Sequence, residues 1–218
     1  MDMDRFATGK TLQFVRQPRA SAEPVDIDIE EEPMTSLADY ARIPIDFEVS
    51  RILDVTPPGG DATGFLYSER AVDESFMKDY DAAEENGPLS WPDRFDLSNW
   101  ALFAARVEGN RVGGAVVAFR TPGAAMLDGR NDLAMLWDIR VAPEMRNHGV
   151  GSALLAVVEE WIVERGAKSL KVETQNINVP ACRFYECRGF VLRAANEDAY
   201  PDFPEEIQLL WYKDVPVK

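Results

Sequence analysis

The sequence has few residues of the kinds that bind transition metals or form disulfides. Its 218 residues include two cysteines, Cys182 and Cys187, and one histidine, His148. The cysteines lie five positions apart in a segment expected to be helical, so their side chains diverge and no disulfide is expected. Because no second soft ligand stands at zinc-binding spacing, we predict reduced thiols and no metal site.

Positive charge is also scarce. The chain carries 23 Lys and Arg against 38 Asp and Glu, a formal net charge of −15. A nucleic-acid partner requires a basic face, so we expect none. An acidic surface favours a cationic partner or substrate through long-range attraction, although it also serves solubility alone.

Long apolar runs are missing as well. No stretch is long enough to span a bilayer, and the first residues, MDMDRFATGK, do not form the basic and then apolar pattern of a secretory signal. We therefore expect no membrane association and a cytoplasmic protein.

Residues 1–42 differ in composition from the rest of the chain. They contain the linker-like stretch RQPRASAEP and the acidic, alternating stretch VDIDIEEEP. We expect an N-terminal arm that is partly disordered or adds an edge strand to the body. Residues 43–218 are expected to form one domain.

Hydrophobic periodicity predicts a mixed α/β arrangement in this domain. The predicted strands are Ile45–Val55, Trp100–Val107, Arg111–Phe119, Leu133–Val141, Ser169–Thr174 and two more in GFVLRAA and EIQLLWYKDV. The predicted helices are Asp73–Glu85, Gly149–Arg165 and the segment NVPACRFYECR. Strands and helices in this order are typical of a single sheet covered by helices.

The segment RNHGVGSALL, Arg146–Leu155, follows a predicted buried strand and opens a helix. Glycines there let an anion approach the unpaired N–H groups of the helix start, whose partial positive charge favours phosphate. Arg146 adds a fixed charge and Ser152 a hydroxyl. A Gly-Lys-Ser/Thr ending is absent, and Leu154 stands in place of the third glycine of the dinucleotide fingerprint. The spacing predicts either a phosphate site of another kind or a plain turn into a helix.

Two motifs together resemble those of a known family. VAPEMRNHGVGSALL resembles the acetyl-coenzyme A loop of the GNAT acetyltransferase superfamily, with its pattern Arg/Gln-x-x-Gly-x-Gly/Ala, and NVPACRFYECRGF resembles that superfamily's second signature. ETQNINVPACRFYECRGF, AYPDF and EIQLLWY further resemble the streptothricin acetyltransferase branch, over about residues 45–213. The resemblance implies an α+β fold: a single GNAT-like domain whose mixed, mostly antiparallel sheet has a splayed central strand and flanking helices.

The resemblance also implies that acetyl-CoA is the co-substrate and that its pantetheine arm lies beside the splayed strand. The N–H of Ile139 would face the thioester oxygen, and main-chain amides near Asn147–Ser152 would hold the pyrophosphate. The residues implied to bind the cofactor are Ile139, Arg140, Val141, Arg146, Asn147, His148, Gly149, Val150, Gly151, Ser152, Asn178 and Tyr185.

Catalytic roles follow from the same resemblance. Tyr185 would protonate the departing thiolate. Asp138 and Glu173 are candidates for the base that takes a proton from the amine, with ordinary structural roles as the alternative. On a regular strand, the Asp138 side chain lies on the opposite face from that of Ile139, unless a bulge intervenes. We expect direct attack by the amine without an acetyl-enzyme, because neither cysteine nor the histidine is placed as an activated nucleophile.

The acceptor implied by the resemblance is a small cationic amine, such as the β-lysine amine of streptothricin. The residues expected to bind it are Tyr80, Asp81, Glu84 and Tyr200, with Asp79, Glu85 and Asp202 nearby. A solvated helix face is the simpler explanation of the acidic run. A protein or peptide N-acetyltransferase and a non-catalytic acetyl-CoA sensor stay open as alternatives, as does a homodimer.

Overall fold

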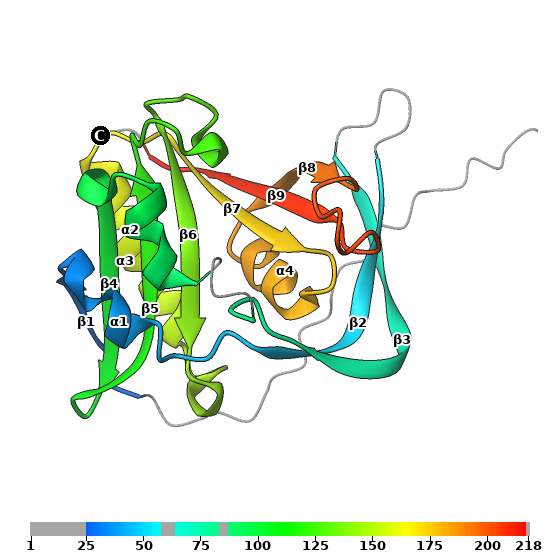
Figure 1. The fold of residues 1–218 in the computed structure, drawn as a ribbon, viewed down its shortest axis with the longest axis horizontal. Helices are drawn as coiled ribbons and strands as arrows, with labels where there is room; N and C mark the ends of the chain where they lie inside the picture. The colour runs from blue at the N-terminus through cyan, green and yellow to red at the C-terminus, as the bar shows by residue number, and fades with distance from the viewer. Residues whose placement is uncertain (1–24, 58–63, 83–86, 217–218) are drawn as a thin grey trace, which may run out of the picture.

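The structure is a computed structural model that describes residues 25–57, 64–82 and 87–216. It contains a seven-stranded sheet and a separate two-stranded ribbon (Figure 1). In spatial order the sheet consists of β1 (Asp28–Glu32), β4 (Trp100–Val107), β5 (Asn110–Phe119), β6 (Leu133–Val141), β7 (Ser169–Gln175), β9 (Gln208–Asp214) and β8 (Val191–Asn196). The ribbon pairs β2 (Phe47–Thr56) with β3 (Leu66–Lys78).

The sheet is mixed. β6 and β7 pair in parallel, whereas the other neighbouring strands pair antiparallel. Four helices accompany it among the described residues: α1 (Leu37–Tyr40), α2 (Trp91–Arg94), α3 (Val150–Glu164) and α4 (Val179–Glu186). The predicted α+β fold with a mixed, mostly antiparallel sheet is confirmed.

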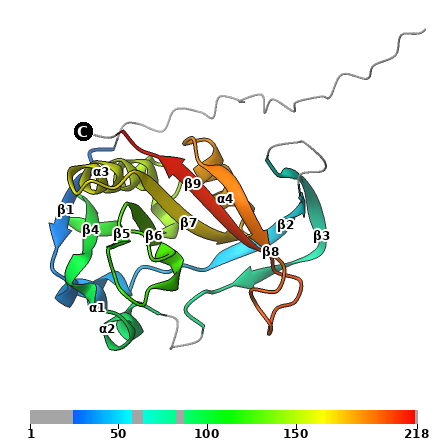
Figure 2. The same cartoon turned by 90° about the horizontal axis from the view of Figure 1, so that it is seen from above.

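Helices cover both faces of the sheet. Figure 2 shows α3 and α4 on one side, and α1 and α2 on the other. Strand β5 is buried on both faces, so Ala115 and Val117 join the cluster around α3 while Val116 and Ala118 join the cluster around α1 and α2. Successive side chains of this apolar strand point to opposite faces of the sheet, so the strand contributes to both cores.

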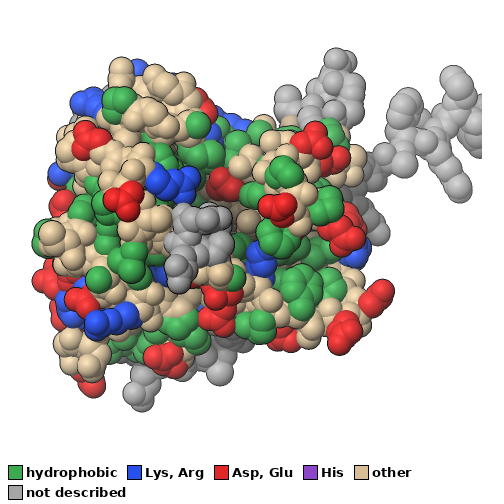
Figure 3. Space-filling view, in the orientation of Figure 1, with side chains coloured by type: hydrophobic (Ala, Val, Ile, Leu, Met, Phe, Trp, Pro, Cys, Tyr) green, Lys and Arg blue, Asp and Glu red, His purple; other side chains and the backbone are tan. Residues whose placement is uncertain are grey.

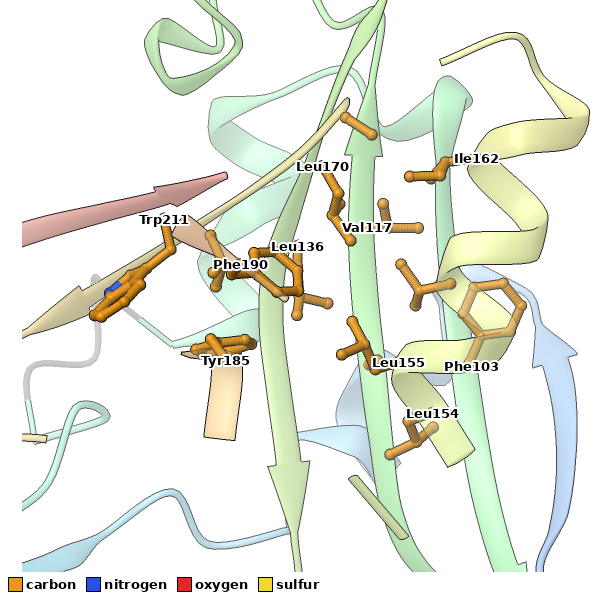
Figure 4. Close-up of a cluster of buried hydrophobic side chains, with 14 of the residues drawn as sticks. Phe103, Val117, Leu136, Leu154, Leu155, Ile162, Leu170, Tyr185, Phe190 and Trp211 are labelled. Atoms are coloured by element: carbon orange, nitrogen blue, oxygen red, sulfur yellow. The ribbon is translucent and has the colours of Figure 1, made fainter. Parts of the chain in front are cut away.

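The larger core extends from α3 to the far strands of the sheet. Leu154 and Ile162 of α3 lie along one side of this cluster in Figure 4, and Tyr185 and Trp211 lie at its other end. These side chains are at most 3% exposed. Their burial fixes α3 and α4 against the sheet through the hydrophobic effect.

β6 and β7 separate partway along their length. Their parallel pairing joins Leu133–Leu136 to Ser169–Val172 and goes no further. β6 nevertheless stays paired with β5 as far as Val141, opposite Gly113. The two strands therefore form a V, visible in Figure 1, and the predicted splayed central strand is observed.

A β-bulge interrupts β6 where this separation begins. Val117 pairs with Leu136 and Val116 with Asp138, so Trp137 is an extra residue on β6. A bulge of this kind bends a strand and changes the direction of the side chains that follow. The strict alternation expected for Asp138 and Ile139 therefore does not apply across this point.

The ribbon is attached to the open end of β7. The N–H of Leu53 in β2 donates to the carbonyl of Asn176 over 2.9 Å, and the Asn176 side chain donates back to the Leu53 carbonyl over 3.2 Å. The Asn176 side-chain oxygen also accepts from the N–H of Ile207, just before β9. One buried asparagine thus joins the ribbon, β7 and the last loop.

Most predicted elements are confirmed, with ends shifted by a residue or two. These are the hairpin of β4 and β5, strands β2, β6, β7, β8 and β9, and helices α3 and α4. Gly166, predicted to end α3, has φ of +79°, in the left-handed region where glycine is favoured.

The predicted helix Asp73–Glu85 is wrong. Residues up to Lys78 belong to β3, which pairs with β2, and Glu85 lies outside the described residues. Val49 pairs with Phe76 and Arg51 with Ala71, so residues 72–75 stand opposite Ser50 alone. This irregularity destroys the alternation that would have indicated a strand. Pairing with the preceding strand overrides local helix propensity here.

The predicted N-terminal arm, residues 1–42, lies partly outside the described residues. Its described part contributes β1, which pairs with β4 at the edge of the sheet, and α1, whose Leu37 and Tyr40 are buried. The boundary between arm and domain stays a prediction. No helix of the described segments is long and apolar enough to cross a membrane.

Gly114 marks the closest approach of α1 to the sheet. A Cβ atom at this position would lie 2.7 Å from the Phe103 carbonyl oxygen and 2.8 Å from two Tyr40 ring carbons. We expect Gly114→Ala to lower the free energy of unfolding by about 1–3 kcal/mol through overpacking. Denaturant unfolding of both proteins measures this, and an unchanged midpoint would contradict the packing described.

Candidate active site

A cavity of about 570 Å³ opens where β6 and β7 separate. In Figure 3 a hollow lies between the part of the molecule built on β4–β6 and the part that carries β7–β9 and the ribbon. Its walls include Trp137, Asp138, Ile139 and Arg140 of β6, Glu173 of β7, Asn178 and Tyr185 of α4, Lys78, Asp79, Tyr80 and Asp81 at the end of β3, and Tyr200, Phe203 and Glu206 before β9.

The cavity brings together most of the predicted catalytic and acceptor residues. Asp138, Glu173 and Tyr185 all line it, as do Tyr80, Asp81, Tyr200 and the predicted cofactor residues Ile139, Arg140 and Asn178. Glu84 lies outside the described residues. Asp202 is exposed and is not part of the wall.

The remaining predicted cofactor residues follow directly from the end of β6. Val141 ends the strand, and Arg146, Asn147, His148, Gly149, Val150, Gly151 and Ser152 form the loop and the first turn of α3. Asn147 and Gly149 adopt left-handed conformations, with φ of +67° and +92°. The loop thus leads from the end of the splayed strand directly into a helix, and the partial positive charge of a helix start suits an anion.

Gly151 allows α3 and α4 to meet closely at this point. A Cβ atom there would lie 3.3 Å from the ring of Phe184 in α4. Any larger side chain would press on that ring and move the helix start away from α4. The second glycine of the motif is therefore explained by packing, whichever ligand the loop holds.

Arg146 fastens the loop to its surroundings. Its guanidinium donates to the Val141 carbonyl over 3.2 Å and to the Asp46 carbonyl over 2.9 Å. His148 is exposed, with its Nδ1 3.0 Å from the Arg146 carbonyl. Contacts with main-chain carbonyls thus fix the position of the Arg146 charge at the base of the loop.

A second guanidinium at the loop escaped the sequence analysis. Arg188, just after α4, donates to the hydroxyl of Ser152 and lies 3.8 Å over the ring of Phe184. It follows the second signature directly, but its closeness to the glycine loop depends on how α3 and α4 pack, which no local pattern indicates.

Arg140 organises the acidic side of the cavity. Its side chain is 2% exposed, donates to Asp138 over 2.7 Å and binds both carboxylate oxygens of Asp81. It also donates to the Ile43 carbonyl over 3.3 Å. We predicted a cofactor contact for this residue, whereas its side chain ties the turn after β3 to β6. Burial raises the pKa of Asp138, although the Arg140 charge opposes that shift.

Glu173 and Tyr200 form a second polar pair. The Tyr200 hydroxyl donates to a Glu173 carboxylate oxygen, which brings the loop before β9 onto β7. Burial and the Glu173 charge raise the pKa of Tyr200, so the phenol keeps its proton at neutral pH.

α4 presents Asn178 and Tyr185 to the cavity. Asn178 caps the helix by accepting from the N–H of Ala181 over 3.2 Å, and its side-chain nitrogen lies 3.4 Å from the Tyr80 hydroxyl. Tyr185 is 3% exposed and packs edge-on against Phe184 and Phe190. Burial raises the pKa of Tyr185, so the phenol keeps its proton at neutral pH.

The cysteines take different positions. Cys182 is buried beside Thr174, 3.3 Å from its hydroxyl, and burial raises the pKa of the thiol to about 12. Cys187 is exposed. Both are free thiols, although only Cys182 lies in the core. Within the described segments no group of His, Cys, Asp and Glu is arranged to hold a metal ion.

Comparison with known proteins agrees with this geometry. A family model for the acetyltransferase (GNAT) family matches residues 69–190, more than half of the chain, and the chain belongs to this family. The predicted family and enzyme class are confirmed.

Individual relatives show which members of this family the chain resembles. The chain is 30% identical to streptothricin acetyltransferase A of Bacillus subtilis over 150 residues, which cover 68% of this chain and 79% of that protein. It is 25% identical to a streptothricin acetyltransferase of Streptomyces lavendulae over 170 residues, 78% of this chain and 84% of that protein.

Solved structures share the fold. A crystal structure of nourseothricin acetyltransferase superposes with a TM-score of 0.67 at 27% identity, covering 87% of this chain and 99% of that one. A Bacillus anthracis protein described as a candidate streptothricin acetyltransferase, in complex with acetyl coenzyme A, gives a TM-score of 0.70 at 24% identity with the same coverage.

Thiol chemistry tests the placement of the cysteines. Because the Cys182 thiol has a pKa of about 12 and is buried, only Cys187 should react quickly with a disulfide-exchange reagent at pH 8. We expect one fast thiol per native chain and two after denaturation. Cys187→Ser should leave no fast thiol, and two fast thiols in the native protein would refute the assignment.

Proposed function

We propose that the protein transfers the acetyl group of acetyl-CoA to a primary amine of a small cationic acceptor of the streptothricin type. The observation that carries the proposal is the separation of β6 from β7 beyond Leu136 and Val172, with a cavity at the gap. Ile139 is on one side of that cavity and Tyr185 on the other. The similarity to streptothricin acetyltransferases supports the choice of donor and acceptor.

In this proposal the donor is held mainly by main-chain groups. β6 beyond the last β7 partner has amides and carbonyls free of that neighbour, and pantetheine amides would pair with those of Ile139 and Val141. The first turn of α3 would bind the pyrophosphate, with Arg146 and Arg188 adding positive charge. The Ile139 N–H would then stabilise the oxyanion that forms on the thioester.

Proton transfers are assigned to Tyr185 and Glu173. The neutral amine attacks the thioester carbon, the C–S bond breaks, and the Tyr185 hydroxyl protonates the thiolate. A base must remove the proton of the amine. Glu173 stands one residue beyond the last parallel pair and accepts from the neutral Tyr200, whereas Asp138 is bound to the Arg140 cation. We therefore assign the base to Glu173, and to Asp138 the positioning of Arg140.

Attack is proposed to be direct, without an acetyl-enzyme. A thiol with a pKa of about 12 supplies almost no thiolate at neutral pH, which disfavours Cys182 as a nucleophile. Cys187 is exposed, and neither it nor His148 is part of the cavity wall. The cytoplasmic location and the homodimer stay predictions.

The direct test is an acetylation assay. Purified protein with acetyl-CoA and streptothricin should release coenzyme A and yield the acetylated antibiotic by mass spectrometry. Peptides and a panel of simple amines, run in parallel, distinguish a protein acceptor. Tight binding of acetyl-CoA with no acceptor turned over would favour a sensor and defeat the proposal.

Tyr185→Phe tests the proposed acid. Removing the hydroxyl leaves the buried ring in place, so acetyl-CoA affinity should hold while kcat falls by roughly 10²-fold or more. Stopped-flow or steady-state rates together with calorimetric acetyl-CoA binding separate the two quantities. An unchanged kcat would remove Tyr185 from the mechanism.

Glu173→Gln and Asp138→Asn distinguish the two candidate bases. The Glu173 variant should lose roughly 10²-fold or more in kcat at neutral pH and recover part of it as pH rises and the amine loses its proton in solution. The Asp138 variant should affect kcat less and thermal stability more, because it removes one of the two carboxylates that pair with the buried Arg140. The opposite ranking would move the base to Asp138.

A further inference from the structure

Glu206 is a buried acid with one oxygen left unpaired. The residue lies just before β9, is 7% exposed and lines the cavity. Its Oε1 accepts from the Lys78 ammonium over 2.5 Å, whereas its Oε2 has no hydrogen-bond partner among the described residues. A carboxylate has room for several donors, and a buried oxygen without one costs free energy. Oε2 of Glu206 therefore lacks a hydrogen-bond donor among the described residues.

The surroundings of Glu206 favour a cation. Among the described residues of the cavity wall, the carboxylates outnumber the cationic side chains, and both cations are already paired: Lys78 with Glu206, and Arg140 with Asp81 and Asp138. The remaining acids are Asp79 and Glu173. A positively charged donor would restore the balance of charge, and a neutral one would not.

Aromatic rings complete the surroundings. Tyr80 and Tyr200 line the same cavity as Glu173 and Glu206, and the Tyr200 hydroxyl donates to Glu173. Burial raises the pKa of both phenols. Phe203 already makes a cation–π contact, since the Lys78 ammonium lies 3.8 Å from the centre of its ring. Carboxylates combined with aromatic rings are a common setting for an ammonium group.

We infer that Glu206 binds a second, protonated amine of the acceptor through its unpaired oxygen. The inference rests on the proposed function, in which Glu173 and Tyr185 serve the amine that reacts. That amine must lose its charge, whereas the second keeps its charge and anchors the molecule. The acceptor class is thus a diamine, or a larger compound that carries two primary amines.

Lys78 has a supporting role in this arrangement. By binding Oε1 it holds the carboxylate at the end of β3 and leaves Oε2 for the ligand. The competing explanation is that the ion pair only fastens the last loop to the ribbon. The two explanations differ for Lys78→Met, which breaks the ion pair but keeps the Glu206 charge.

The test compares 1,5-diaminopentane with pentylamine, which differ by the second ammonium group. Binding of each to the full chain with coenzyme A present is followed by NMR titration, which requires no turnover. Wild-type protein should bind the diamine roughly tenfold more tightly, the value of one charge-assisted hydrogen bond. Glu206→Gln should reduce that ratio to nearly one. Glu205→Gln, an exposed neighbour with the same loss of charge, should retain it.

The Lys78→Met variant distinguishes the two explanations: ligand binding by Glu206, or an ion pair that only attaches the last loop to the ribbon. If Glu206 binds the ligand, this variant keeps or increases the preference for the diamine; if the ion pair only fastens the loop, the preference falls as in Glu206→Gln. Equal binding of the two amines to wild-type protein would also overturn the inference. Should Glu206→Gln fail to fold, the wild-type and Lys78→Met ratios still decide. If streptothricin is not acetylated but the preference for the diamine over pentylamine still depends on Glu206, only the proposed acceptor is rejected.

Discussion

The structure depends on a sheet that divides along one seam. β6 is held by β5 to its end and β7 by β9, yet β6 and β7 share only the pairs from Leu133–Leu136 to Ser169–Val172. Beyond these pairs each strand is hydrogen-bonded to its outer neighbour, while its inner edge has no partner strand. Main-chain groups of such an edge require hydrogen bonds from elsewhere, and an extended molecule with amides of its own is a natural complement.

Charge is arranged around this seam with opposite sign at its two ends. The end near α3 holds Arg146 and Arg188 together with the helix amides. The end near the ribbon holds Asp81, Glu173 and Glu206. Anionic and cationic ligand groups would thus be drawn to different residues around the same gap. The net charge of the chain conceals this polarity, because it records the sum alone.

The sequence was informative where local pattern and structure coincide. The glycine loop, α4 and the strands around them are confirmed because apolar periodicity and helix caps are local signals. β3 was mispredicted because its pairing with β2 is irregular over residues 72–75, which removes the alternation of a regular strand. The side-chain partnerships of Arg140, Arg188 and Glu206 were out of reach because each joins elements far apart in the chain.

Asn176 has a mechanical consequence. Because one side chain links the ribbon, β7 and the loop before β9, these parts are coupled and move together. They face the β4–β6 half across the gap, and the short parallel ladder at Leu133–Leu136 is the principal joint between the halves of the sheet. Widening of the gap beyond that ladder would also stretch the ion pair between Arg140 of β6 and Asp81 in the turn after β3, so this ion pair opposes it.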